Sequence, residues 1–448
     1  MGSYISGAFH LAVEQINADP GLLPDYHLEY VFDNTCRDEL LSTKWFMEHW
    51  KRGAKAFFGF EMRCRAAAVM AAAQNLPIIS HKCSDESVSN NNYPTFARTV
   101  PALTEITKAF LSLFNHFKWR KFTVICDDSD KSEVMLRTIK MGRTGLMDKG
   151  EYALVYLDAE YDWKDVYHAM NNHFFRNTLK TISQSWDDPD SEDLELINYS
   201  RSAIAIISTP VQVTSAKFQY FWRKTKEYSI HFKQKKVPEG VESNRFACYL
   251  YDAVKLYATA LTAVLKETSQ EEISRGYDPV SDGKRIIQKI IGRTYRSIVL
   301  KVIFSEFFYS TVFTRQRRAE LRILGIQGFE TRIDRNGSAM GNYTLLALQE
   351  VEPVTDPKNA SYYPFNAALT VTADFVYEGV LPMLRFKHAI QWVRGKPPLD
   401  EPKCGFYGEK CSVQKDEYYC FAMFSAVQKQ IYSYDFDRVK SSVQKTLL

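Results

Sequence analysis

The sequence predicts an α/β protein built on doubly wound, mostly parallel sheets. Along the first 125 residues, segments with helical spacing of apolar residues alternate with short apolar runs. This alternation is typical of helices packed on a parallel sheet. One of the runs, Phe122-Thr-Val-Ile125, has the apolar character of a strand buried in such a sheet. With 448 residues, the chain is long enough for two or three domains.

The first elements follow from local patterns. A helix is predicted over 8–16, because its apolar residues fall on one face, and Gly21 and Pro24 belong to the segment that ends it. The sequence Leu-Glu-Tyr-Val-Phe at 28–32 alternates between apolar and polar positions in its first half and predicts a strand.

The next elements continue the alternation. A second helix is expected over 40–50 and a strand over 56–60. The alanine-rich segment 65–75 is a good helix former, and the apolar 76–80 is a short strand. Apolar residues at helical spacing then predict a helix over 106–117, just before the strand at 122–125.

Composition excludes several classes of function. The net charge of +4 is small for this length, so the sequence does not predict a nucleic-acid partner. No phosphate-binding loop or zinc spacing occurs, and the nine histidines show no metal spacing. We therefore expect no catalytic residues, no metal and no cofactor. Aromatic residues make up 14% of the chain, which favours core packing over the alternative of a recognition surface.

The apolar runs and the cysteines give information about the cellular compartment of the chain. No apolar run reaches the roughly 18 residues of a membrane helix, and no signal peptide is visible after Met1. Eight cysteines are present. Cys404 and Cys411 flank a short glycine-containing loop, which favours a disulfide over a zinc knuckle, since other ligands are lacking nearby.

Two further patterns are weak signals. Acidic residues cluster at 158–162 and 187–193, where a solvated loop is favoured over a calcium site or an acid/base pair. Four possible glycosylation signatures occur, at Asn198, Asn336, Asn342 and Asn359.

Six longer segments carry a family resemblance. They are SGAFHLAVEQINADPGLLPDYHLEYVFDNTC (6–36), LPIISHKCSDESVSN (76–90), YPTFARTVPALTEITKAFLSLFNHFKWRKFTVI (93–125), VPEGVESNRFACYLYDAVKLYATAL (237–261), IQGFETRIDRNGSAMGNYTLLAL (326–348) and WVRGKPPLDEPKCGFYGEKC (392–411). In this order they resemble the extracellular ligand-binding region of natriuretic-peptide-type receptor guanylate cyclases. The resemblance is strongest to invertebrate members.

The resemblance implies a two-lobed fold of the type I periplasmic-binding-protein kind and a sensor rather than an enzyme. Such receptors bind an extracellular ligand, usually a peptide, across a homodimer at the plasma membrane. Binding activates a cytoplasmic cyclase that makes cyclic GMP. This chain would hold only the sensing half, because no cyclase-like segment follows Cys411. Two alternatives stay open: the amino-acid-sensing domain of a glutamate-type receptor, and a soluble or clearance receptor without signalling.

The resemblance also implies a division of the chain. The expected parts are a first lobe over 1–130, a second lobe over 131–240, return helices of the first lobe over 241–298, an anomalous insertion over 299–325, a late hairpin and juxtamembrane segment over 326–411, and a divergent tail over 412–448.

The chain departs from the family in ways that predict truncation at both ends. The family's first strand, before Ser6, has no counterpart, and part of the second lobe after Ser129 is missing. Residues 299–325 resemble nothing in the family, so a retained non-coding segment is favoured over a membrane-active or partner helix. No membrane helix follows Cys411, so contact with the membrane would need a segment that this chain lacks.

Site residues carried over from the family are few. The resemblance pairs Cys36 with Cys64 and Cys404 with Cys411, whereas Cys83, Cys126 and Cys248 are expected to be buried thiols. Ser80, Ser84 and Asp85 follow the carboxyl end of a predicted strand, where open α/β sheets place ligands. Phe60-Glu-Met-Arg63 replaces the family's glycine–proline opening near its halide site, which puts that site in doubt.

Overall fold

The computed structural model describes residues 5–125, 151–158, 201–295, 326–350, 367–403, 410 and 431–435, without the short stretches 37, 61–63, 84, 89–91, 103, 212, 233–243, 293, 329 and 378–380. The chain divides into two compact units. Unit 1 comprises Met1–Glu105 and Val211–Asn342, and unit 2 comprises Ile106–Pro210 and Tyr343–Leu448.

Unit 1 is built on a four-stranded sheet in which all neighbouring strands run parallel. Its order is β1 (Phe57–Phe58), β2 (Ile78–Ser80), β3 (Phe96–Pro101) and β9 (Ser338–Ala339). Successive strand residues point to opposite faces. Ile78 and Phe96 belong to one buried cluster, and their neighbours Ile79 and Ala97 to another. The sheet therefore has a core on each face, as the predicted doubly wound fold requires.

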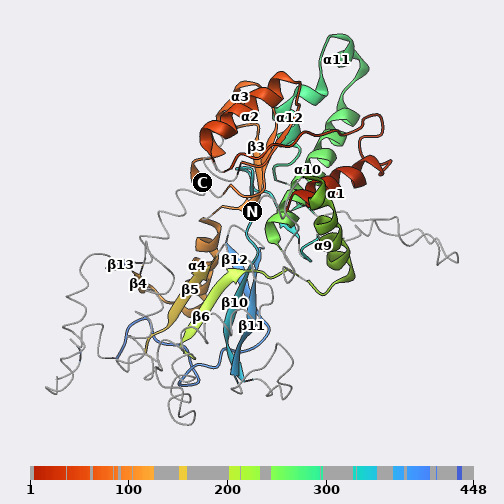
Figure 1. Cartoon of the computed structure of the whole chain (residues 1–448). Coiled ribbons are helices and arrows are strands. Elements are labelled where there is room, and N and C mark those ends of the chain that lie inside the picture. Colours follow the sequence, from red (N-terminus) through yellow and green to blue (C-terminus); the bar gives the residue numbers. More distant parts are fainter. Residues whose placement is uncertain are drawn as a thin grey trace, which may run out of the picture. The chain divides into compact units, whose positions relative to one another are not determined.

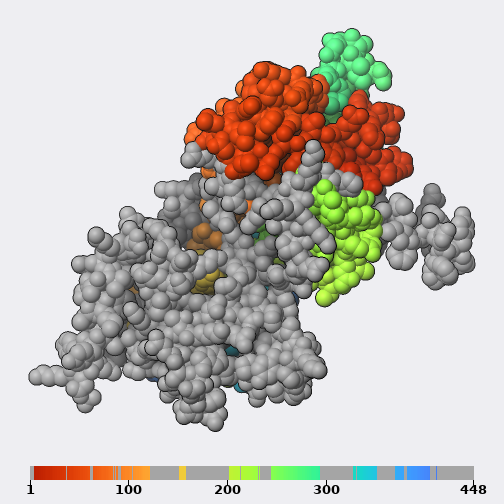
Figure 2. Space-filling view, in the orientation of Figure 1, coloured from red at the N-terminus to blue at the C-terminus, as the bar shows by residue number. Residues whose placement is uncertain are grey.

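Helices cover both faces of this sheet (Figure 1). One face packs against α1 (Ser6–Asn17), α9 (Ala216–Ser229), α10 (Arg245–Glu267) and α12 (Gly283–Gln288). The other face packs against α2 (Glu39–Lys51) and α3 (Cys64–Ala73). The short α11 (Gln270–Ser274) has no buried residue and stands out at the surface of the unit (Figure 2). Short 3₁₀ turns lie at Glu86–Val88, Ile230–Phe232 and Pro279–Ser281.

Side chains at the helix ends explain where the helices begin. Asp38 accepts a hydrogen bond from the N–H of Leu41 at the start of α2, at 2.6 Å. Asn244 does the same for the N–H of Phe246 at the start of α10, at 2.9 Å. These caps satisfy N–H groups that have no partner within a helix.

A turn at 334–337 joins the late strands of unit 1. The Asp334 carboxylate accepts from the N–H groups of Asn336 and Ser338, at 2.9 and 2.8 Å. Gly337 has φ +77, and a Cβ there would lie 2.7 Å from the Phe96 carbonyl oxygen. Only glycine fits such a close approach with positive φ. The turn therefore lies directly against β3.

A small two-stranded sheet flanks the expected insertion. β7 (Thr294–Tyr295) pairs antiparallel with β8 (Thr331–Arg332). The chain before residue 296 and the chain after 330 therefore return to neighbouring positions. The segment 299–325 itself lies outside the described residues.

Unit 2 holds a mixed five-stranded sheet. Its order is β12 (Pro382–Phe386), β11 (Ala367–Tyr377), β10 (Tyr343–Glu350), β6 (Ala203–Ser208) and β5 (Leu154–Asp158). β5 and β6 run parallel, and the other neighbours run antiparallel. Helix α4 (Thr104–Phe117) packs on the sheet through a cluster that includes Leu113, Ile206 and Leu345.

Two predicted strands differ from the structure. Residues 28–32 form no strand, because the backbone of Leu28 is bound by the Asn17 side chain and the described residues provide no strand beside this segment. Val31 and Phe32 are consequently 60% and 43% exposed. β4 (Lys121–Ile125) forms, but not in a parallel sheet. It pairs antiparallel with β13 (Ile431–Asp435), from the predicted divergent tail.

Candidate functional site

The carboxyl edge of the unit 1 sheet is the first candidate site, since open α/β sheets bind ligands there. The loop 80–88 leaves β2 at this edge and carries the predicted residues Ser80, Ser84 and Asp85. At the start of the loop, the Ser80 hydroxyl accepts a hydrogen bond from the N–H of Cys83 at 3.0 Å. The loop is therefore held tightly at the point where it leaves the strand.

A buried arginine fastens the rest of the loop. Arg98 of β3 is fully buried. Its guanidinium donates to the carbonyl oxygens of Cys83 and Asp85, at 2.9 and 2.8 Å, and to the Ser338 hydroxyl at 3.0 Å. A buried cation is tolerated only when its donors are satisfied. Arg98 therefore ties the loop to two strands of the sheet.

Ser80 and Asp85, two of the predicted cleft residues, differ in burial and in hydrogen bonding. Ser80 is fully buried and serves loop closure. Asp85 is exposed, and its carboxylate accepts from the N–H of Ser87 at 2.8 Å. Ser84 lies outside the described residues. The role of these residues in ligand contact stays a prediction.

Helix α10 brings further groups to the same edge. The Thr99 hydroxyl donates to the carbonyl oxygen of Tyr249, at 2.8 Å. The Lys82 ammonium lies 4.9 Å from the centre of the Phe246 ring, a cation–π distance. The edge thus combines a half-buried cation and an aromatic ring with hydroxyl groups. Its described residues present polar and aromatic contacts.

Sequence reasoning missed Arg98, Phe246 and Tyr249. A signal for Arg98 existed, because a single charged residue stands inside the otherwise uncharged strand Phe96–Pro101. The other two lie more than 140 residues away in the sequence, and no local pattern joins them to the loop.

The disulfide prediction for the first lobe is wrong. Cys64 at the start of α3 is bonded to Cys83 in the loop, with their Cα atoms 6.0 Å apart, and Cys36 is an exposed free thiol. Cys83 was expected to be a buried thiol, so that expectation also fails. The bridge forms because the chain turns back through β2 to place the loop against α3. Cys248 is a buried thiol in α10, as predicted. Cys126, Cys404 and Cys411 lie outside the described residues.

The predicted glycosylation sites Asn336 and Asn342 differ in their surroundings. Asn336 is partly exposed, in the turn before Ser338, whose side chain is buried. Asn342 donates its side-chain amide to the carbonyl oxygen of Glu330 at 3.0 Å, a bond that a glycan on that nitrogen would disturb. Asn198 and Asn359 lie outside the described residues.

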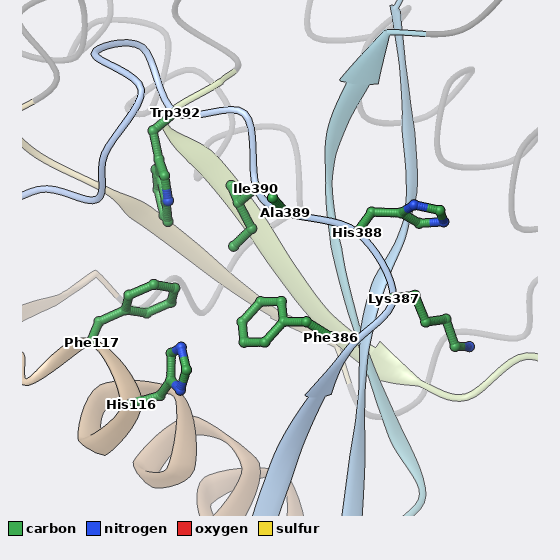
Figure 3. Close-up of a pocket in the computed structure, with 8 residues that line it drawn as sticks. All are labelled: His116, Phe117, Phe386, Lys387, His388, Ala389, Ile390 and Trp392. Atoms are coloured by element: carbon green, nitrogen blue, oxygen red, sulfur yellow. The ribbon is translucent and has the colours of Figure 1, made fainter.

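Unit 2 contains a second candidate, a cavity of about 390 Å³. It is lined by His116, Phe117, Phe386, Lys387, His388, Ala389, Ile390 and Trp392. Figure 3 shows the side chains of His116, Phe117, Phe386 and Ile390 turned toward a common space, with Trp392 beside them, whereas Lys387 and His388 point away. The cavity is therefore mainly aromatic and apolar.

Two lysines of unit 1 are taken partly or wholly out of water: Lys255 on α10 is buried, and Lys217 on α9 is half-buried. Burial lowers the pKa of Lys255 to about 8, and the nearby Asp19 opposes this shift. Burial also lowers the pKa of Lys217, against the pull of Asp252. These shifts affect stability, because holding a charged lysine away from water costs free energy.

Within the described ranges, no three His, Cys, Asp or Glu residues gather as metal ligands. The same ranges contain no helix that is both long and apolar enough to cross a membrane.

Residues 5–144 match the family described as receptor family ligand binding region. The chain is 26% identical to the receptor-type guanylate cyclase Gyc76C of Drosophila melanogaster over 503 aligned positions, covering 95% of this chain and 30% of that protein. It is 25% identical to guanylate cyclase 32E of the same fly, covering 91% of this chain and 35% of the relative.

The resact receptor of Arbacia punctulata is 21% identical over 91% of this chain and 45% of its own length. The chain thus spans about a third to a half of these relatives. The resemblance to the ligand-binding region of receptor guanylate cyclases, and with it the two-lobed α/β fold class, is confirmed.

Proposed function

We propose that this chain is the sensing region of a receptor guanylate cyclase and binds an extracellular ligand. The observation that carries the proposal is the match of residues 5–144 to a receptor ligand-binding region. The described part of that range forms a parallel sheet with a tightly held loop at its carboxyl edge. A fixed loop at this edge gives a ligand a preformed surface, which lowers the entropic cost of binding.

The finer features of the proposal rest on the family resemblance described in the sequence analysis. The ligand is a peptide, the sensing region acts as a homodimer on the outer side of the plasma membrane, and binding is coupled to the synthesis of cyclic GMP. The name of the resact receptor points the same way, since it is a receptor for a named ligand. Residues 5–144 match the ligand-binding region, so we assign the synthesis of cyclic GMP to a part of the receptor other than these residues.

A binding experiment tests the proposal. The full 448-residue chain is secreted from insect cells, panned against a phage-displayed library of random 12-residue peptides, and the selected peptides are measured by calorimetry. We expect peptides that bind the chain and lose affinity in the Lys82→Ala and Asp85→Ala variants. Exposed Lys51→Ala, in α2, serves as the control.

A second arm decides the ligand class. The twenty free amino acids are added to the chain at millimolar concentration, and the melting temperature is recorded. A ligand that binds only the folded chain raises this temperature. A clear rise with one amino acid, together with no selected peptide, would replace the peptide proposal by the amino-acid sensor.

A further inference from the structure

We propose that residues 392–401 form a strap that moves as one body with helix α4 and so couples the chain after β12 to that helix. The inference deepens the proposed function, on which it rests, because a sensor must transmit the state of its binding region to the chain that follows. It depends on three sets of contacts between the strap and the turn 117–121, which joins α4 to β4.

The first contacts are aromatic. Trp392 at the start of the strap lies edge-on to Phe117 and Trp119, with ring centres 5.5 and 6.1 Å apart. Phe117 and Trp119 are themselves stacked at 4.7 Å. Trp392 and Trp119 are each 6% exposed. Aromatic pairs of this geometry bind through both burial and their quadrupoles.

The second contact is a buried hydrogen bond. The indole N–H of Trp119 donates to the carbonyl oxygen of Pro398 at 2.8 Å. Because Trp119 and Pro398 are buried, water does not readily replace either partner. Releasing the strap would leave a buried donor and a buried acceptor without partners, so the bond holds the middle of the strap in place.

The third contacts are electrostatic. One Asp400 carboxylate oxygen accepts from the N–H groups of Arg120 and Lys121, the latter at 3.0 Å. Next to it, the Glu401 carboxylate pairs with the ammonium of Lys121 at 3.1 Å and that of Lys410 at 2.8 Å. The strap is thus fixed at its start, middle and end, whereas Arg394 to Pro397 between these points are exposed.

The strap starts close to β12, which ends at Phe386, and finishes on the α4–β4 turn. It therefore joins an edge strand of the unit 2 sheet to the helix packed on that sheet. If these contacts act as one cooperative unit, loosening one end loosens the other. Independent contacts would respond only where they are altered.

Hydrogen exchange on the full chain tests this, without any ligand. Asp400→Ala should speed exchange about tenfold at the amide of Gly395, which Asp400 does not touch and which donates to the Trp392 carbonyl at 2.9 Å. Trp119→Phe keeps an aromatic ring but removes the indole donor. It should speed exchange by a similar factor at the amide of Gly395, which lies on the strap and which Trp119 does not hydrogen-bond.

Lys396→Ala is the matched control, because this strap residue is exposed, and it should change none of these rates. The amides of Leu346 and Leu348 in β10 report that each variant is folded. Variants that keep β10 protected but alter exchange only beside the substituted residue would overturn the proposal. So would a wild-type strap that exchanges as fast as unstructured chain. Because no ligand takes part, these outcomes are separate from failure of the proposed function.

Discussion

The loop 80–88 of unit 1 and the strap of unit 2 both carry irregular backbone past the end of a sheet, but different chemistry holds them. The loop is fastened by a fully buried guanidinium and a disulfide. The strap is fastened by aromatic rings, one indole hydrogen bond and a partly exposed carboxylate. The first set is costly to break, since it leaves buried polar groups unpaired, and it suits a fixed binding surface. The second set is weaker and suits a part that transmits a change.

The largest expected effect comes from the buried arginine of the loop. Arg98→Met removes the donors to Cys83, Asp85 and Ser338, so two buried acceptors and one partly buried acceptor lose a partner. We expect the free energy of unfolding of unit 1 to fall by about 3–5 kcal/mol. Urea unfolding followed by circular dichroism measures this loss.

Arg65→Met is the control for Arg98→Met. Arg65 is exposed and donates to the Tyr93 hydroxyl at 3.1 Å, so its loss should cost less than about 1 kcal/mol. Equal effects of the two substitutions would show that the loop does not depend on Arg98.

The disulfide gives the next largest effect. Replacing both Cys64 and Cys83 by alanine frees a loop with a sequence separation of 19 residues, which lowers stability by about 3 kcal/mol. Cys36→Ser should change the melting temperature little, because Cys36 is an exposed thiol. Mass spectrometry of unreduced peptides identifies the bridge directly, and a Cys36–Cys64 peptide would contradict the structure.

A second buried cation in unit 1 sharpens the contrast with Arg98. Lys255 is 5% exposed, and burial lowers its pKa to about 8. Between pH 8 and about 10.5 the unfolded chain binds this proton more readily than the folded chain. The free energy of unfolding therefore rises with pH across that window. Below pH 8 the folded protein bears the full cost of the buried Lys255 charge.

Lys255→Met removes the free-energy cost of burying the Lys255 charge. It should raise stability at pH 7 by about 1–3 kcal/mol and abolish this part of the pH dependence. The measurement is the difference in melting temperature between wild type and variant from pH 7 to 10. The difference cancels the contribution of nearby tyrosines. A difference that stays constant with pH would mean that Lys255 is charged in the folded protein throughout.

Much of unit 1 was predictable because its signals are local. The helices α1, α2 and α3 follow from patterns within their own segments, and their alternation with β1 and β2 predicted the doubly wound sheet, whereas β3 was not predicted as a strand. The strand at 28–32 failed for the opposite reason. A strand exists only if a neighbour supplies its hydrogen bonds, and the sequence of one segment does not reveal its neighbour.

The site was less predictable. Cysteine pairing depends on distances in the folded chain, and the choice of Cys36 over Cys83 followed family context. The strap contacts join residues near 119 to residues near 398, a separation that no periodicity spans. Asp85 was predicted because it follows a predicted strand, whereas Arg98, which holds the loop, was missed although it is the single charged residue of β3.

The buried Ser338 has a consequence for the order of events during biosynthesis. Its hydroxyl accepts from Arg98, and the Gly337 turn presses it against β3. An enzyme that recognises Asn336 through the signature Asn-Gly-Ser must reach that hydroxyl, so it can act only on chain that has not yet folded. If Asn336 is modified, modification and folding therefore compete in time. The fraction of molecules carrying sugar at Asn336 would record how quickly this turn closes in the cell.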